Sequence, residues 1–329
     1  SAQILEMDGN TDEIKSLIDS AMQAGVERNL GHDYLVDIEE RYSDTARITS
    51  PTPWDIINEL MQGGLGAGEL GVVVAPAGIG KSWVLSAMGA YAISQGLNVV
   101  HYTLELNEAY VGLRYDSIFT GVESQNLKYH KEEVMEKLYD LKGSLTIKYY
   151  PTKACTVNTL SAHLKKVTTF GTKVDMVLVD YADIMKDVGK AQEMRHALGN
   201  IYEDLRGMAG EMQIPIWTAS QANRSALDED VIEASKVAES YTKVMTADFV
   251  ISLSRKIEDK IGNTGRFHII KNRFGPDGLT YPAKINTNIG KIEIFEANSV
   301  QGKGVQHKIN NRDNQTKAIL SARYEDLMS

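Results

Sequence analysis

Short apolar runs alternate with helical stretches over the central part of the chain, from Trp54 to about residue 298. The runs have the character of buried strands and lie at residues 70–75, 98–104, 145–150, 174–180, 214–219 and 248–253. Between them are two apolar stripes with helical spacing, one formed by Val157, Leu160, Leu164 and Val167, the other by Met194, Leu198, Ile201, Leu205, Met208 and Met212. This alternation predicts an α/β fold in which helices cover both faces of a mostly parallel sheet.

The pattern changes after Arg266, where strands follow one another with only turns between them. Residues 275–278 (Gly-Pro-Asp-Gly) and 288–290 (Asn-Ile-Gly) are typical turn sequences. Strands joined by tight turns pair as antiparallel neighbours, which predicts an antiparallel C-terminal edge on the parallel sheet.

Both ends of the chain differ from this centre. Residues 11–25 have an amphipathic helical pattern that Asn10 can cap, and residues 43–53 are polar with two prolines, which is typical of a linker. The helix must bury its stripe either on its own main domain or on another subunit. Residues 299–313 are polar, and residues 316–327 could form a short amphipathic helix, but for this tail we expect disorder. The predicted division is a linker region 1–53, an α/β domain 54–298 and a polar tail 299–329.

Composition and charge narrow the classes of function. With 43% hydrophobic residues in 329, the chain is an ordinary globular protein. No apolar stretch approaches the roughly 20 residues needed to cross a bilayer, and no signal-peptide pattern is present, so we expect a cytoplasmic protein without membrane contact. The single cysteine, Cys155, excludes an internal disulfide, and scattered histidines argue against a structural metal site. The net charge of −9 argues against a broadly basic surface, so any DNA contact must come from local loops.

The first apolar run leads into a glycine-containing turn that ends in Gly80-Lys81-Ser82. In this order, backbone amides near Gly78 and Gly80 can wrap phosphate oxygens, Lys81 can reach the terminal phosphates and the Ser82 hydroxyl can ligate Mg²⁺. The helix expected at 81–94 adds the positive end of its dipole. A plain loop-helix junction is the alternative, because the usual pattern has glycine where this chain has Ala75. The predicted nucleotide-binding residues are Ala75, Pro76, Ala77, Gly78, Ile79, Gly80, Lys81, Ser82 and Trp83.

Polar residues stand where other predicted strands end. The carboxyl ends of parallel strands meet at one sheet edge, so these residues should gather around the phosphates. Asp180 is expected to hold Mg²⁺ opposite Ser82, Glu105 to polarise the attacking water, and Gln221 to sense the terminal phosphate. Each residue has a plainer alternative. Asp180 could simply end a strand, Glu105 could be an acid near a helix that starts at Asn107, and Gln221 could be an exposed loop amide.

Two cations alternate near the end of the strand expected at 266–272, namely Lys271 and Arg273, so their side chains share a face. Residues 265–291 carry five basic side chains against one acid, Asp277. Such a pair could reach a neighbouring subunit's nucleotide, with Arg273 as an arginine finger. A solvated basic strand is the alternative.

These motifs, in this order, resemble the RecA-like ATPase domain of the DnaB-family hexameric replicative helicases, with most likeness to the T-even phage type. The likeness spans about residues 30–297 and rests on 102–106 (Tyr-Thr-Leu-Glu-Leu), 179–181 (Val-Asp-Tyr), 218–224 (Thr-Ala-Ser-Gln-Ala-Asn-Arg), 270–275 (Ile-Lys-Asn-Arg-Phe-Gly) and 31–33 (Gly-His-Asp). The family commonly has alanine at the position of Ala75. The resemblance implies a RecA-like P-loop NTPase core and an ATP-dependent DNA helicase, with ATP and Mg²⁺ bound between subunits of a ring, normally a hexamer. Single-stranded DNA would pass through the central channel, with translocation 5′ to 3′.

The resemblance also implies two DNA-gripping loops, at about 186–195 and 224–241. The candidate DNA contacts are Lys186, Lys190, Arg195, Arg224, Lys236, Glu239 and Ser240. The second loop departs from the bacterial members, because Ala238 stands where they usually carry arginine, which leaves backbone amides to hold phosphates. Too few residues precede the linker for the family's primase-interacting domain, so we expect a fragment or a shortened member. Primase and a helicase loader are the implied protein partners.

Two other functions remain open at this point. A RecA-type recombinase shares the fold and the strand-end glutamate but assembles as an open filament. A KaiC-like regulatory ATPase binds protein partners and does not unwind DNA. A small-molecule kinase is a weaker alternative, because no lid with several arginines is visible.

Overall fold

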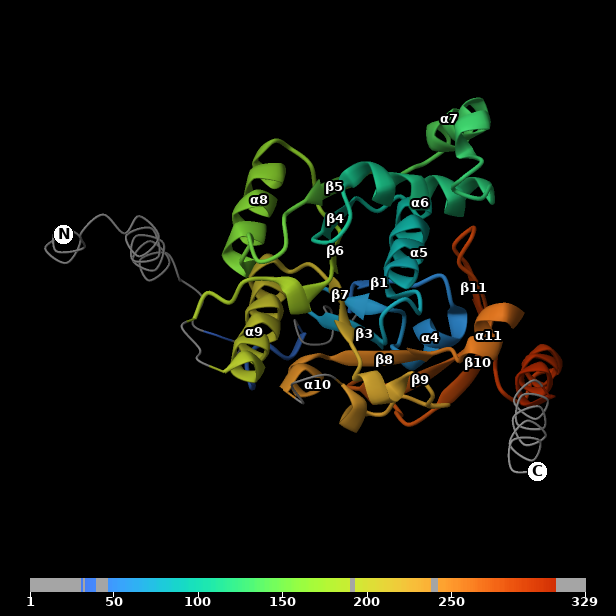
Figure 1. Cartoon of the computed structure of the whole chain (residues 1–329). Helices are drawn as coiled ribbons and strands as arrows, with labels where there is room; N and C mark the ends of the chain where they lie inside the picture. The colour runs from blue at the N-terminus through green and yellow to red at the C-terminus, as the bar shows by residue number, and fades with distance from the viewer. Residues whose placement is uncertain (1–30, 32, 40–46, 190–192, 238–241, 312–329) are drawn as a thin grey trace, which may run out of the picture. The chain divides into compact units, whose positions relative to one another are not determined.

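The computed structural model describes residues 31, 33–39, 47–189, 193–237 and 242–311 (Figure 1). The chain divides into two compact units, Ser1–Arg47 and Ile48–Ser329. In the first unit, the Asp33 carboxylate accepts hydrogen bonds from the backbone N of Leu35 and Val36, at 3.0 and 3.1 Å, and so holds a turn. The helix expected at 11–25 and its cap lie outside the described residues.

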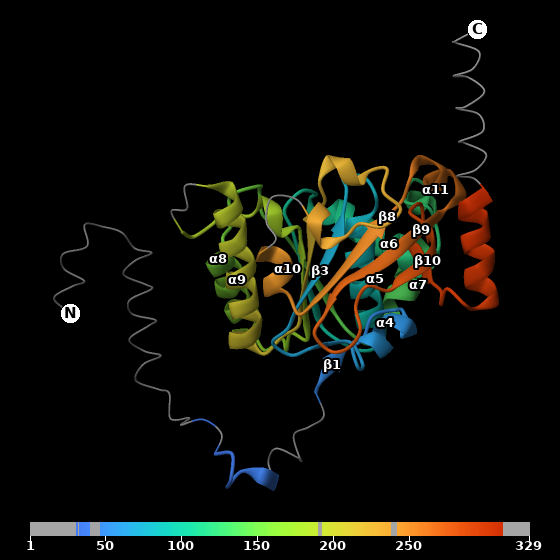
Figure 2. The same cartoon turned by 90° about the horizontal axis from the view of Figure 1, so that it is seen from below.

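A nine-stranded sheet forms the centre of the second unit, in the order β11-β10-β9-β8-β3-β7-β6-β4-β5. Six neighbouring strands pair in parallel: β3 (Leu70–Ala75), β4 (Val99–Thr103), β5 (Leu145–Tyr149), β6 (Met176–Asp180), β7 (Ile216–Gln221) and β8 (Phe249–Ser254). The antiparallel edge consists of β9 (Thr264–Asn272), β10 (Thr280–Asn286) and β11 (Lys291–Ile294). Figure 2 shows the sheet continuing from β3 through β8 and β9 to β10. The predicted α/β fold, with a parallel centre and an antiparallel C-terminal edge, is confirmed.

Helices cover both faces of this sheet (Figure 1). One face packs against α4 (Asp55–Leu60), α5 (Lys81–Ser94) and α6 (Glu108–Thr120), and the other against α8 (Val157–Thr169), α9 (Met194–Met212) and α10 (Thr242–Thr246). Val72 and Val74 belong to the core under α8 and α9, whereas Val73 and Ala75 belong to the core under α5. Successive side chains of a strand point to opposite faces, so a strand buried on both faces needs the continuous apolar run seen in the sequence.

The remaining elements are short. They are the ribbon of β1 (Thr49–Ser50) and β2 (Leu65–Gly66), the helices α7 (Lys131–Tyr139) and α11 (Ile257–Gly262), and the 3₁₀ turns η1 (Leu127–Tyr129), η2 (Ala182–Ile184), η3 (Arg224–Ala226) and η4 (Ala234–Lys236). Local chemistry sets several helix starts. Thr156 caps α8, because its hydroxyl accepts a hydrogen bond from the backbone N of Thr159 at 3.2 Å. Within the described part of the chain, no helix is long and apolar enough to span a membrane.

The C-terminal segment departs from the prediction. Residues 300–311 are helical, where polar composition predicted disorder. Val305 and Ile309 are 3% and 1% exposed. They are four residues apart, so they lie on one side of the helix and give this polar segment an apolar stripe to bury. The expectation of disorder was therefore wrong for this segment, and the alternative helix at 316–327 lies outside the described residues.

Candidate nucleotide site

The loop between β3 and α5 turns at the carboxyl end of the parallel strands. Gly78 and Gly80 have φ angles of +70° and +122°, a region that glycine adopts at little cost. Gly80 stands directly before the first turn of α5, so the backbone N–H groups and the positive end of the helix dipole favour an anion here. The loop borders a cavity of about 310 Å³, lined by Ala77, Gly78, Gly80, Lys81, Ser82, Trp83, Glu105, Leu106, Arg114, Tyr181, Gln221 and Thr287.

Ala75 occupies the last position of β3 and does not have a positive φ, so the first loop position needs no glycine. Its carbonyl accepts hydrogen bonds from Lys81 Nζ at 2.9 Å and from the backbone N of Ala222 at 3.1 Å. Lys81 also donates to the carbonyl of Pro76 at 3.2 Å. Burial lowers the pKa of Lys81, and the carboxylates around it oppose that change. The lysine is therefore fixed by its own loop, beside the helix start that would hold the phosphates.

Asp180 ends β6 and is 3% exposed. Burial raises its pKa, while a hydrogen bond with Ser82 and the positive charges of Arg114 and Lys81 act to lower it. The Oδ1 atom of Asp180 is buried and has no hydrogen-bond partner among the described residues. Mg²⁺ prefers oxygen ligands and usually takes only one or two carboxylates from the protein, the rest coming from phosphates and water. Asp180 and Ser82 therefore fit the expected Mg²⁺ site.

Glu105 and Gln221 reach the same cavity from different strands. Glu105 lies just after β4 and is exposed. Asn107 caps α6 by accepting a hydrogen bond from the backbone N of Tyr110 at 3.0 Å, so Glu105 lies before the helix and not in its first turn. Gln221 is the last residue of β7, and its backbone N donates to Asp183 Oδ2 at 2.9 Å. One carboxylate and one amide are thus placed at the cavity beside the phosphate loop.

Arg114 of α6 lines this cavity and was missed by the sequence analysis. Its guanidinium lies 5.3 Å from the centre of the Trp83 ring. Burial lowers the pKa of Arg114, and the charges of Asp180 and Glu105 oppose this. Its Nη1 atom is buried and has no hydrogen-bond partner in the described part of the chain. A cationic donor at the cavity wall is therefore available to an anionic ligand. The sequence gives no signal for Arg114, because no short motif distinguishes it from any other arginine in a helix.

Lys271 and Arg273 lie at the opposite ends of the parallel strands from the phosphate loop. Because β9 runs antiparallel to β8, its last residues lie where β8 begins. Lys271 Nζ donates to the carbonyl of Val244 at 3.0 Å, and Arg273 Nη1 donates to Asp248 Oδ1 at 2.9 Å. Neither cation lines the cavity. A strand rises about 3.3 Å per residue, so six-residue β3 separates these two ends by a distance on the order of 20 Å.

The candidate DNA contacts are only partly described. Lys186 is exposed. Arg195 Nε pairs with Glu193 at 2.8 Å and Lys236 Nζ with Glu229 at 2.7 Å, so each contacts a carboxylate of its own chain. An antiparallel bridge between Ala222 and Val237 closes the base of the second expected loop. The remaining candidates, Lys190, Glu239, Ser240 and the side chain of Arg224, lie outside the described residues.

Comparison with known proteins identifies relatives of this chain. The family model of the DnaB-like helicase C terminal domain matches residues 51–289. The DnaB-like replicative helicase of Enterobacteria phage T4 is 27% identical over 276 residues, which cover 80% of this chain and 58% of the T4 protein. The replicative DNA helicase DnaB of Helicobacter pylori is 24% identical over 172 residues, which cover 51% of this chain and 35% of that protein. The chain thus spans little more than half the length of the T4 relative.

Solved structures share the fold. An ATPase domain in one solved structure superposes with a TM-score of 0.67 and 18% identity, covering 85% of this chain and 99% of that one. A DnaB-like replicative helicase, described with its interactions with primase, gives a TM-score of 0.70 and 18% identity, covering 90% and 74%. The RecA-like core and the family resemblance inferred from the motifs are confirmed. Since the family model matches well over half of the residues, the chain belongs to the DnaB-like helicase family, through the C-terminal domain of that family.

Proposed function

We propose that this chain is the ATP-hydrolysing motor of a replicative DNA helicase. The observation that carries the proposal is the convergence of four strand ends on one site. The phosphate loop after β3, Glu105 after β4 and Gln221 at the end of β7 line one cavity, and Asp180 at the end of β6 hydrogen-bonds Ser82 of that cavity. A phosphate clamp, a metal ligand, a carboxylate and an uncharged amide are the groups that nucleoside triphosphate hydrolysis requires.

Each residue has one role in the proposed reaction. Lys81 neutralises charge on the terminal phosphates. Asp180 and Ser82 would hold Mg²⁺, which would supply further positive charge to the phosphates. The Glu105 carboxylate accepts a proton from the water that attacks the terminal phosphorus. Gln221 contacts the terminal phosphate through its side-chain amide. Arg114 supplies a second positive charge from the cavity wall.

Assembly into a ring completes the site. Lys271 and Arg273 lie at the sheet edge opposite the cavity of their own chain, so they can serve only the nucleotide of another subunit. A closed ring, normally a hexamer, offers each nucleotide such a neighbour and encloses a channel for single-stranded DNA. We propose 5′ to 3′ movement along that strand, with contacts from the segments 186–195 and 224–241. Primase and a helicase loader are the proposed partners, in the cytoplasm of the cell where replication occurs, which is the host bacterium if a phage encodes the chain.

Unwinding of a forked DNA substrate tests the proposal. The purified chain should displace the annealed strand only with ATP and Mg²⁺, and Lys81→Ala should abolish displacement while leaving the fold intact. DNA-stimulated hydrolysis without displacement would support a regulatory ATPase and overturn the helicase function. Electron microscopy with ATP and DNA adds the assembly, because open filaments instead of closed rings would indicate a recombinase.

A further inference from the structure

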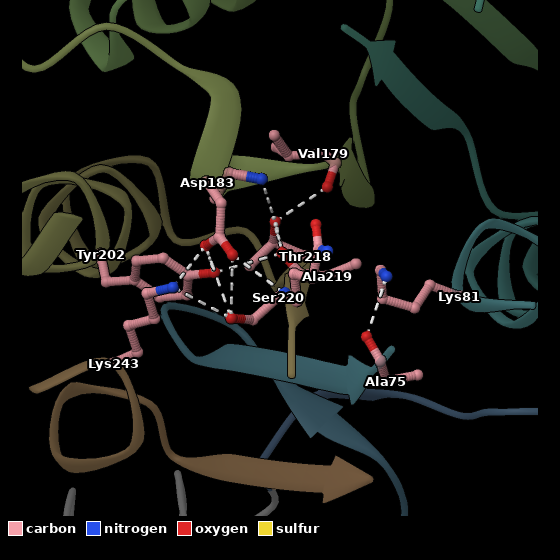
Figure 3. Close-up of polar contacts among 11 residues, drawn as sticks. Ala75, Lys81, Val179, Asp183, Tyr202, Thr218, Ala219, Ser220 and Lys243 are labelled. Atoms are coloured by element: carbon pink, nitrogen blue, oxygen red, sulfur yellow. Dashed lines mark hydrogen bonds and ion pairs between the residues drawn. The ribbon is translucent and has the colours of Figure 1, made fainter. Parts of the chain in front are cut away.

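A buried polar cluster joins the turn after β6, the end of β7, α9 and α10 (Figure 3). Its centre is Asp183 in η2, directly after β6, with a side chain 11% exposed. Asp183 accepts hydrogen bonds from Tyr202 Oη at 2.7 Å, from Lys243 Nζ at 2.8 Å and from the backbone N of Gln221 at 2.9 Å. Ser220 Oγ lies 3.2 Å from the same carboxylate. We call Asp183, Tyr202, Ser220 and Lys243 the Asp183 cluster. It holds the backbone N–H of Gln221 through Asp183.

Lys243 is the unexpected member of the cluster. It is 1% exposed, its Nζ also donates to Ser220 Oγ at 3.2 Å, and it lies 5.5 Å from the centre of the Tyr202 ring. Moving an ammonium group and a carboxylate out of water carries a large desolvation cost, and apolar residues of similar volume often serve stability as well or better. The buried ion pair of Asp183 and Lys243 therefore indicates a role in fixing the positions of β7 and α10, in addition to any effect on stability.

The helix α10 lies between this cluster and two parts of the proposed machinery. It directly follows residues 224–241, the second segment expected to hold DNA. Its Val244 and Met245 carbonyls accept hydrogen bonds from Lys271, one of the two cations offered to the neighbouring subunit. Lys243, the residue before Val244, points into the Asp183 cluster (Figure 3). The five-residue helix α10 thus contacts both Asp183, which holds Gln221, and Lys271, which would reach the nucleotide of the next subunit.

We propose that Asp183 and Lys243 are a positioning pair that couples Gln221, at a subunit's own nucleotide, to α10, and through α10 to Lys271 and to the expected DNA segment. A displacement of Gln221 that follows the terminal phosphate acts on Asp183 through the backbone N–H. The buried pair passes this displacement to α10, because separating the two charges would leave each unpaired in the interior. The inference rests on the proposed function, since it requires ATP turnover and DNA binding by the same chain.

The test compares ATP hydrolysis by the full chain with and without a single-stranded oligothymidine. The variant is Asp183→Asn combined with Lys243→Met. It removes both charges, keeps similar side-chain volumes and leaves no buried charge without its partner. We expect unchanged ATP affinity and unchanged DNA-free turnover, with the stimulation by DNA reduced at least about fivefold, the lower end of typical coupling between sites. The control is Lys165→Met combined with Glu211→Gln, an ion pair at 2.9 Å between α8 and α9 that contacts neither the Asp183 cluster nor the expected DNA segments, and it should leave stimulation unchanged.

The outcomes separate the coupling from the proposed function. Stimulation equal to that of the wild type in the double variant overturns the coupling while the helicase function stands. A wild-type chain that hydrolyses ATP without any response to DNA overturns the proposed function and the coupling with it. If circular dichroism shows that the double variant does not fold, Tyr202→Phe takes its place, because it deletes one hydrogen bond to Asp183 and keeps the ring. It too must lower the stimulation, and an unchanged ratio there contradicts the coupling.

Discussion

Arg273 donates from Nη1 to Asp248 Oδ1 of its own chain, at 2.9 Å. Asp248 is also held by Arg206 Nε at 2.6 Å and by the backbone N of Leu70 at 2.9 Å. The Arg273 side chain is 66% exposed, whereas that of Asp248 is 2% exposed. Arg273 can therefore leave Asp248 without stranding a buried charge, because Arg206 remains paired with it. An arginine that acts on a neighbouring subunit needs this freedom.

Replacing Arg273 by alanine should leave nucleotide binding intact and lower hydrolysis by a factor of about 10³ or more, the range of arginine fingers. Because Asp248 keeps Arg206, the free energy of unfolding should change by less than about 1 kcal/mol. Steady-state phosphate release and thermal melting measure both effects. Arg206→Ala is the control, since it should lower the melting temperature and spare hydrolysis in the molecules that remain folded. Wild-type turnover in Arg273→Ala would remove this residue from the mechanism.

Glu105→Gln should bind ATP and fail to cleave it, because an amide cannot accept the proton of the attacking water. A general base typically contributes about 10² to 10⁴-fold, so single-turnover cleavage should slow by that factor. Binding of a fluorescent ATP analogue and quenched-flow phosphate release separate the two steps. Normal phosphate release from this variant would assign the base to another group.

Mixing the two inactive variants tests whether the site is shared between subunits. Glu105→Gln disables the nucleotide site of its own chain, whereas Arg273→Ala disables the site of the neighbour. In a mixed ring, an interface that combines the intact Glu105 of one chain with the intact Arg273 of the next is complete. Hydrolysis should therefore recover partially on mixing after the rings are dissociated and reassembled. No recovery, with reassembly shown by gel filtration, would contradict action of Arg273 between subunits.

Arg114→Met should weaken ATP binding. A hydrogen bond to a charged group contributes about 1.5 to 3 kcal/mol, which corresponds to roughly ten- to a hundredfold in the dissociation constant. Arg114→Lys should retain part of this affinity, because it keeps the charge and loses the planar fork. Titration calorimetry with ATP measures the change, and Arg195→Met, at an exposed cation, is the control. Equal affinities in wild type and Arg114→Met would show that Arg114 does not contact the nucleotide.

His101 should make folding stability depend on pH. It is fully buried on β4, and burial, with a smaller effect from Arg114, lowers its pKa from 6.5 to about 3. Between about pH 6.5 and about pH 3, the unfolded chain therefore binds a proton on His101 that the folded chain does not bind. Stability is lost as the pH falls through this window, by about 1.4 kcal/mol per pH unit.

The variant for this test is His101→Leu combined with Tyr115→Phe, because His101 Nδ1 lies 2.9 Å from Tyr115 Oη and changing one partner alone would leave the other unpaired. Denaturant unfolding between about pH 6.5 and roughly pH 5 should show a shallower slope in the double variant than in the wild type. The same slope in both proteins would show that His101 does not titrate with unfolding.

Much of the fold was predictable because its signals are local. A strand buried on both faces must be apolar throughout, so β3 and β6 were visible as uninterrupted runs. Glu105 and Gln221 could be assigned to one edge because parallel strands share a direction, and the structure places both at one cavity with the phosphate loop. The helix at residues 300–311 was missed because two buried apolar residues in a polar segment give too weak a periodicity.

The sequence by itself determined the order of the strands along the chain, the phosphate loop and the polar residue that follows each strand, because these depend on neighbours a few positions away. Only the tertiary structure decided which distant side chains meet. Asp183 and Lys243 are 60 residues apart in the chain, and Arg114 reaches the phosphate loop from a separate helix. No spacing rule connects such residues, because strand order and helix packing set their distances. The same reason applies to Arg273, whose place at the edge opposite its own nucleotide site follows from the antiparallel pairing of β9 with β8.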